Sequence, residues 1–208
     1  VNNGQANYVD MTVNAGGTST NVGYEHGEDL VVADGAVHTN TGTSIWNTVE
    51  ISGSGMNSED LGDGPKGNEQ GFTSDSILGI GSDAADETVD IAGDYTNHGI
   101  VDASKAEDTN VTGSLVNDGQ GLYDDMTITA GGSSVNDGYE KGDILTVEDG
   151  THSNTGTSIW NNVTIGENAS GTNGEELGDG PKGHEEGFTS DSIMGVGSDE
   201  ADDVFEVA

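Results

Sequence analysis

Apolar residues recur along the chain in pairs that enclose one other residue. In the first part of the chain each pair lies 19 residues after the previous pair. Such a period-2 apolar spacing is typical of β-strands with one face turned inward. A strand that returns at this interval predicts one coil of a solenoid. The pairs are Met11/Val13, Leu30/Val32 and Val49/Ile51, followed later by Met126/Ile128, Leu145/Val147 and Val163/Ile165.

A turn motif, Asn-x-Gly, keeps the same period between these strands. It begins at Asn2, Asn21 and Asn40, and again at Asn97, Asn117, Asn136 and Asn154. Asparagine and glycine tolerate positive φ, and we expect these turns to use that conformation. The sequence therefore predicts an all-β, right-handed parallel β-solenoid of ~19-residue coils. In this fold one apolar residue per coil stacks in a column: Val13, Val32 and Ile51, and likewise Ile128, Val147 and Ile165.

A longer repeat contains the short one. VNNGQANYVDMTVNAGG at 1–17 returns as VNDGQGLYDDMTITAGG at 116–132. A repeat of ~115 residues also suits tandem immunoglobulin-like β-sandwich modules, which are the alternative fold. A sandwich gives no reason for a 19-residue spacing, so the pattern favours the solenoid. The expected organisation is a first long repeat (1–92), a connecting coil (93–115) and a second long repeat (116–208).

The segment MTVNAGGTSTNVGYEHGEDLVVADGAVHTNTG resembles the strand-loop-strand passenger repeats of autotransporter adhesins. Their Val-x-x-Gly-Gly turn is matched at Val13–Gly17 and more loosely at Val32–Gly35. The resemblance covers about 1–53 and 93–168, and 53–88 departs from the family pattern together with the acidity of the chain. It implies a secreted parallel β-helix that carries adhesive surfaces away from a bacterial cell, and so an extracellular or cell-surface location.

The 19-residue period fails from Gly53 to Ser76, where the chain is rich in glycine and acidic residues. Two motifs within or beside this stretch, LGDGPKG and GFTSDSI, return unchanged in the second long repeat. Loops of this length in a compact array are usually functional or disordered. We therefore expect an acidic loop inserted into the solenoid.

Acidic residues near the end of each insert are candidate calcium ligands. Gly79–Asp83 and Gly195–Asp199 resemble part of the Gly-Gly-x-Gly-x-Asp repeat of secreted calcium-binding proteins. Carboxylate oxygens suit calcium better than a transition metal, and a formal net charge of -35 favours bound cations. For any single residue the alternative is a solvated acidic face. The candidates are Asp75, Asp83, Asp86, Glu87, Asp191, Asp199, Asp202 and Asp203.

Composition narrows the function classes further. The chain has 39 Asp and Glu against 4 Lys and Arg, so we expect no nucleic-acid binding. No apolar run approaches the ~20 residues of a membrane span, so we expect no membrane insertion. It has no cysteine, which excludes disulfides and a thiol nucleophile. The five histidines are scattered, and we expect them at the surface or in turns. Trp46 and Trp160 lie in identical TGTSIWN segments, and we expect core packing rather than sugar stacking.

No nucleophile elbow or phosphate loop is found, and we expect no enzyme. The leading hypothesis is an extracellular structural or adhesive repeat protein of a bacterial surface: a stalk, adhesin or filament subunit. Two alternatives stay open, a calcium-stiffened β-sandwich module of a giant adhesin and a solenoid enzyme acting on polysaccharides. Neither end of the chain looks capped, so we expect head-to-tail self-association along an array or filament, with the acidic sides opposing lateral contact. Host or matrix glycans are further candidate partners.

Overall fold

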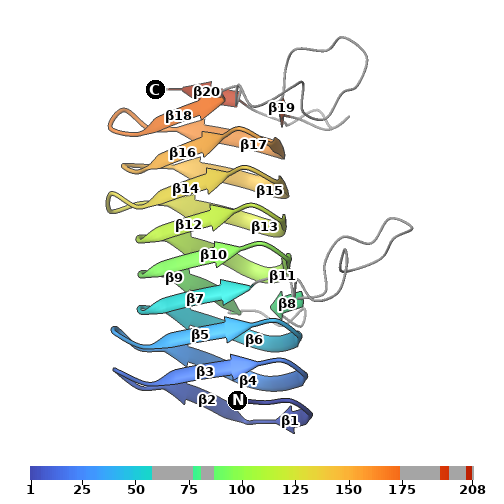
Figure 1. The fold of residues 1–208 in the computed structure, drawn as a ribbon. Coiled ribbons are helices and arrows are strands. Elements are labelled where there is room, and N and C mark those ends of the chain that lie inside the picture. The colour runs from blue at the N-terminus through green and yellow to red at the C-terminus, as the bar shows by residue number, and fades with distance from the viewer. Residues whose placement is uncertain (58–76, 81–86, 174–192, 197–204, 208) are drawn as a thin grey trace, which may run out of the picture.

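The structure is a computed structural model that describes residues 1–57, 77–80, 87–173, 193–196 and 205–207. These residues form one stack of coils built from two β-sheets, and they contain no helix (Figure 1). Neighbouring strands pair in parallel, each with the strand of the coil above or below. The predicted parallel β-solenoid is confirmed, and the β-sandwich alternative is wrong because sandwiches pair their strands in antiparallel fashion.

The first sheet, which we call sheet A, has eight strands of four residues, and every one of them ends in asparagine. The strands follow one another up the stack in chain order. They are β3 (Thr18–Asn21), β5 (Val37–Asn40), β7 (Ser54–Asn57), β10 (Asp94–Asn97), β12 (Ser114–Asn117), β14 (Ser133–Asn136), β16 (Thr151–Asn154) and β18 (Ser170–Asn173).

The second sheet, sheet B, has twelve strands. Most coils give it one long strand: β4 (Tyr24–Val32), β6 (Thr43–Ile51), β11 (Ile100–Val111), β13 (Gln120–Ile128), β15 (Tyr139–Val147) and β17 (Thr157–Ile165). Three coils give it two short strands instead: β1 (Gln5–Asn7) with β2 (Asp10–Val13), β8 (Ile77–Ile80) with β9 (Thr88–Ile91), and β19 (Ile193–Val196) with β20 (Phe205–Val207).

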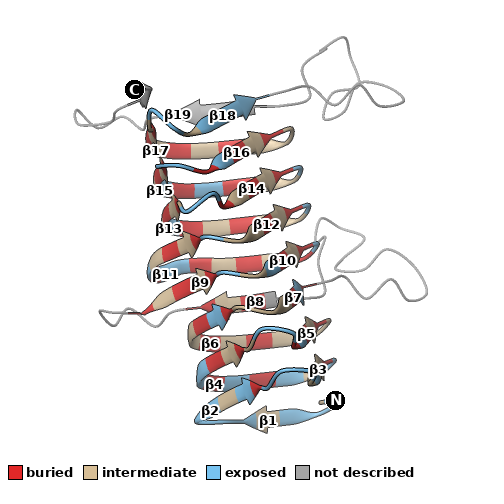
Figure 2. Ribbon diagram, turned by 90° about the vertical axis from the view of Figure 1, so that its left-hand side faces the viewer, coloured by how far each residue is buried: buried red, intermediate tan, exposed pale blue. Residues whose placement is uncertain are grey.

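The coils wind in a right-handed sense, as predicted. In Figure 1 the strands of sheet A lie in front and run to the right, and the chain returns behind them through sheet B while it rises toward the C-terminus. Figure 2 shows buried positions alternating with intermediate or exposed ones along the strands, so each sheet turns one face to the core.

The predicted apolar column is confirmed. Val13 is in register with Val32 and Val32 with Ile51, while Val147 pairs with both Ile128 and Ile165. Ile91 and Val111 fill the coils between these two groups, so one column runs through both long repeats. The column residues are between 0% and 6% exposed: Val13, Val32, Ile51, Ile91, Val111, Ile128, Val147 and Ile165.

The stretch from β7 to β10, which includes the first expected insert, adds a single coil to the stack. β7 pairs with β5 below and with β10 above, so Asn40 and Asn97 are two coils apart rather than three. The coil between β7 and β10 contains 58–76 and 81–86, which lie outside the described residues. Residues 93–115 include β10 and the first two residues of β12, and these strands pair directly with each other.

The glycine of the Asn-x-Gly turns has a different role from the one predicted. A Cβ on Gly42 would lie 2.1 Å from the carbonyl oxygen of Gly23 in the coil below. Successive turns approach so closely that only glycine fits, and the expectation of positive φ at these turns is wrong. Among the described residues positive φ occurs instead at the opposite corner, at Gly16, Gly35, Ala130 and Gly131.

Candidate functional site

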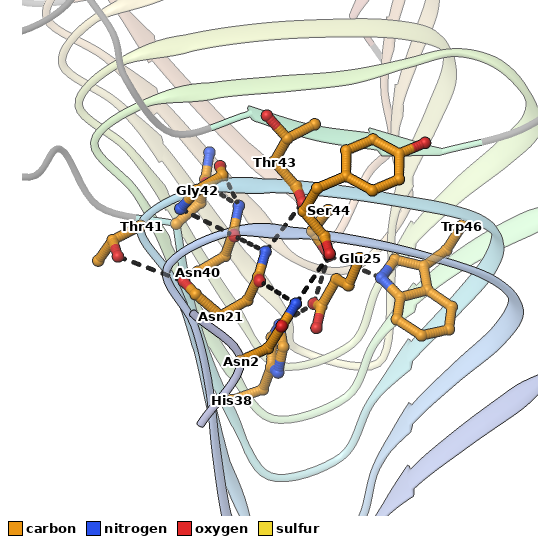
Figure 3. Close-up of polar contacts among 12 residues, drawn as sticks. Asn2, Asn21, Glu25, His38, Asn40, Thr41, Gly42, Thr43, Ser44 and Trp46 are labelled. Atoms are coloured by element: carbon orange, nitrogen blue, oxygen red, sulfur yellow. Dashed lines mark hydrogen bonds and ion pairs between the residues drawn. The ribbon is translucent and has the colours of Figure 1, made fainter. Parts of the chain in front are cut away.

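Asparagine side chains form a hydrogen-bonded ladder inside the stack, where sheet A meets the Asn-x-Gly turns (Figure 3). The Nδ2 of Asn21 donates to Oδ1 of Asn40 at 2.9 Å, and Asn40 donates in the same way to Asn57 at 2.9 Å. Asn21 Nδ2 also donates to the carbonyl of Thr43 at 2.8 Å, which fixes the turn of the next coil. The members are Asn2, Asn21, Asn40, Asn57, Asn97, Asn117, Asn136, Asn154 and Asn173.

Two members of this asparagine ladder were missed by the sequence motif. No glycine follows two residues after Asn57 or Asn173, so neither matches Asn-x-Gly. Asn57 donates to Asn97 at 2.9 Å across 40 residues of sequence, and so continues the ladder past the insert. Their distances from the preceding members, 17 residues for Asn57 and 19 for Asn173, are the signal that identifies them.

The core also contains a buried polar cluster in each long repeat. In the first cluster Ser44 Oγ donates to Glu25 Oε1 at 2.7 Å, and Trp46 Nε1 donates to Ser44 Oγ at 2.7 Å. His38 Nε2 lies 3.4 Å from Glu25 Oε1 (Figure 3). All four residues are between 0% and 2% exposed, so a substrate cannot reach them and their contacts serve to stabilise the fold.

The second cluster repeats this arrangement in β15, β16 and β17. Ser158 Oγ donates to Glu140 Oε1 at 2.5 Å, and Trp160 Nε1 donates to Ser158 Oγ at 2.9 Å. His152 Nε2 lies 3.1 Å from Glu140 Oε1. Because both repeats build the same contacts, the long repeat preserves the polar cluster as a unit.

Register explains why these residues meet. Glu25 in β4 lies directly below Ser44 in β6, and Gly27 lies directly below Trp46. A Cβ on Gly27 would come within 2.2 Å of the Trp46 ring, which Tyr8 covers with a ring-centroid distance of 5.9 Å. Trp46 is 0% exposed. The expectation of core packing is therefore confirmed, and the same holds for Trp160 on Gly142.

Burial shifts the proton affinity of the first polar cluster. Burial raises the pKa of the Glu25 carboxyl above its usual range, against the opposing effect of the Ser44 hydrogen bond. Burial lowers the pKa of His38 to about 4, so this imidazole is neutral at pH 7. His38 and His152 are each 2% exposed, and their expected surface position is wrong because strand alternation turns them inward.

Three carboxylates meet on the outer surface of sheet B. The oxygens of Asp124 and Asp125 in β13 and Asp143 in β15 all lie within 4.8 Å of one another. Asp124 and Asp143 border an open groove of about 350 Å³. Burial, together with the neighbouring carboxylates, raises the pKa of Asp125 to about 6. A hard cation such as calcium is the ligand that three converging carboxylates suit.

The sequence did not select this aspartate triad. Its signal is an acidic pair at Asp124–Asp125 with a third acid, Asp143, one coil later in the register of β15. Among the predicted calcium ligands the structure describes Glu87, which is 7% exposed just before β9. The other candidates lie outside the described residues: Asp75, Asp83, Asp86, Asp191, Asp199, Asp202 and Asp203.

Comparison with known proteins gives no family. The chain matches no protein-family model, no curated protein and no solved structure. The resemblance to autotransporter passenger repeats therefore stays a prediction. In the described part of the chain no helix is long and apolar enough to cross a membrane.

His38→Gln is expected to flatten the pH dependence of stability on the acid side. The unfolded chain takes up a proton at His38 near pH 6.5, whereas the folded chain resists it down to about pH 4. As pH falls from about 6.5 to about 4, protonation of His38 in the unfolded chain therefore lowers the free energy of unfolding of the wild type by up to about 3 kcal/mol. Urea unfolding at pH 7 and pH 4.5 measures the difference. His26→Gln, at an exposed position, should keep the wild-type slope, and an equal slope in both variants would contradict the assignment.

Asp125→Asn is expected to weaken stabilisation by calcium. If the aspartate triad holds the cation, calcium at about 1 mM should raise the wild-type Tm, and chelation should reverse the rise. The rise should shrink in Asp125→Asn and persist in Asp34→Asn, which removes an exposed carboxylate from a turn. An equal rise in Tm in the two variants would mean that calcium acts only by general screening of the acidic surface, and would contradict a site at the aspartate triad.

Proposed function

We propose that this chain is a structural and adhesive repeat module of a bacterial surface protein, a stalk that holds equivalent segments at regular heights. The observation that supports it is the asparagine ladder, which keeps all coils in one register through both long repeats. A stack of this kind transmits its geometry from coil to coil without a hinge.

Equivalent segments follow equivalent strands. β7 ends at Asn57 and β18 ends at Asn173, so two equivalent strands, each followed in the sequence by a copy of the acidic segment, end at the same corner of the stack. In sheet A these strands are five steps apart, through β10, β12, β14 and β16. At a strand spacing of about 4.8 Å, one long repeat adds about 24 Å to the axis. The stack therefore suits spacing and display better than a chemical reaction.

An extracellular or cell-surface location belongs to the same proposal, and the passenger-repeat resemblance supports it. Head-to-tail association along an array, host or matrix glycans as ligands, and calcium as a bound cation are also parts of it. Calcium has support in the aspartate triad, whose carboxylates converge within 4.8 Å. Glycan binding is supported only by the adhesive character that the resemblance implies, and head-to-tail association by the parallel pairing that each coil makes with the next.

Arrays of one, two and four copies of the long repeat test the stalk. Small-angle scattering should give a maximum dimension that increases by about 24 Å per added repeat, with a constant cross-section. Increments that vary, or a cross-section that grows, would indicate modules on flexible links and contradict a rigid stalk.

A retention assay tests adhesion separately. Cells that display the chain from an outer-membrane anchor are washed over a mucin-coated surface. A glycine-serine linker of equal length in the same anchor is the control. We expect more cells to be retained with the chain than with the linker, and equal retention would contradict an adhesive role while leaving the stalk intact.

A further inference from the structure

The outer face of sheet A is almost free of charge. Each four-residue strand turns two residues outward, and eleven of these sixteen are serine or threonine, four are apolar and one, Asp94, is acidic. Val37 and Met56 on this face are each 40% exposed. We call these residues the neutral face: Thr18, Thr20, Val37, Thr39, Ser54, Met56, Asp94, Thr96, Ser114, Val116, Ser133, Val135, Thr151, Ser153, Ser170 and Thr172.

The outer face of sheet B, in contrast, is rich in carboxylates. Sheets A and B lie on opposite sides of the stack (Figure 2). The strand pattern does not explain this difference in charge between the outer faces, because residues of both sheets alternate in the same way between core and solvent. The described outward and corner positions of sheet B hold eleven carboxylates: Asp10, Glu28, Asp29, Glu50, Asp90, Asp102, Glu107, Asp108, Asp124, Asp125 and Asp143.

This partition decides which surfaces of two copies tolerate contact. With a formal net charge of -35 per chain, any pairing through sheet B would bring carboxylates together and is repelled. The neutral face has one carboxylate in sixteen positions, so two such faces meet with little repulsion. The exposed acids of the neighbouring turns, such as Asp34 and Asp137, would then lie at a wet rim.

We propose that the neutral face is a self-association surface, on which a second copy packs its own neutral face about a two-fold axis. Both acidic sheets then point away from the contact and stay solvated, as an isologous pair allows. The sequence-based expectation that acidic sides oppose lateral contact thus applies to sheet B and not to sheet A.

The size of the face sets the strength of the contact. Eight strands at ~4.8 Å and four residues at ~3.3 Å give a face of roughly 35 by 13 Å, about 450 Å² per copy. The total of about 900 Å² lies near the lower limit for a specific interface, so the pair is weak and reversible. Contacts of this size are populated when copies are crowded.

Sedimentation velocity at physiological salt tests the proposal on the intact chain. We expect the weight-average mass to rise toward that of a dimer between about 10 µM and 1 mM. Val116→Asp places a charge on the neutral face and should abolish the rise. Thr146→Asp adds the same charge to the outer face of sheet B, at a similarly half-buried position. This variant should keep at least half of the rise in weight-average mass.

Charge removal gives the converse test. Asp94→Asn makes the neutral face fully uncharged and should increase the dimer fraction. Asp29→Asn removes one exposed carboxylate from sheet B and should change the dimer fraction less. Because the chain has no cysteine, Thr96→Cys labels the middle of the neutral face uniquely. A short bifunctional maleimide should cross-link Thr96→Cys into dimers and leave Thr146→Cys monomeric.

Three results would overturn the proposal. One is a monomer at every concentration, and another is an equal loss of mass in Val116→Asp and Thr146→Asp. The third is binding of a neutral soluble β-glucan that Val116→Asp abolishes while no dimer forms, which would assign the neutral face to a glycan.

Discussion

The buried amide of asparagine is the group on which the stack depends. An amide side chain without partners in the core is costly, since each unsatisfied donor or acceptor keeps its full desolvation penalty. Asn117 accepts from Asn97 at 2.7 Å and donates to Asn136 at 2.7 Å, and it is 1% exposed. Each asparagine is therefore satisfied only by a coil in correct register above and below, which makes register a property of the whole column.

The sequence predicted the coil because strand and turn spacing are local and repeated. The column from Val13 to Val147 follows from the period alone. The interior polar clusters did not follow, because His38 reaches Glu25 from the other sheet, and no local pattern relates two sheets across a core. The aspartate triad was missed for a similar reason, since Asp143 meets Asp124 only after β13 and β15 are placed in register.

The glycine of the Asn-x-Gly turns lies where the sequence predicted a turn, but it is required there for a different physical reason. Gly42 is required by the approach of Gly23 in the coil below, not by its own φ. The same close stacking brings the asparagine side chains within hydrogen-bond reach. Charge is partitioned on the same scaffold, with carboxylates on the outer face of sheet B and hydroxyls on that of sheet A. One coil geometry thus supplies a satisfied polar interior and two chemically different outer surfaces.

The most direct test is the unfolding free energy of Asn117→Ala, measured in urea against Asn14→Ala at an exposed turn position. The ladder predicts a loss of about 2–4 kcal/mol for Asn117→Ala, because a partner amide and the carbonyl of Tyr139 lose their donor inside the core. Asn14→Ala should stay within about 0.5 kcal/mol of wild type. Equal small losses in both variants would contradict the claim that the asparagine ladder holds the coils in register.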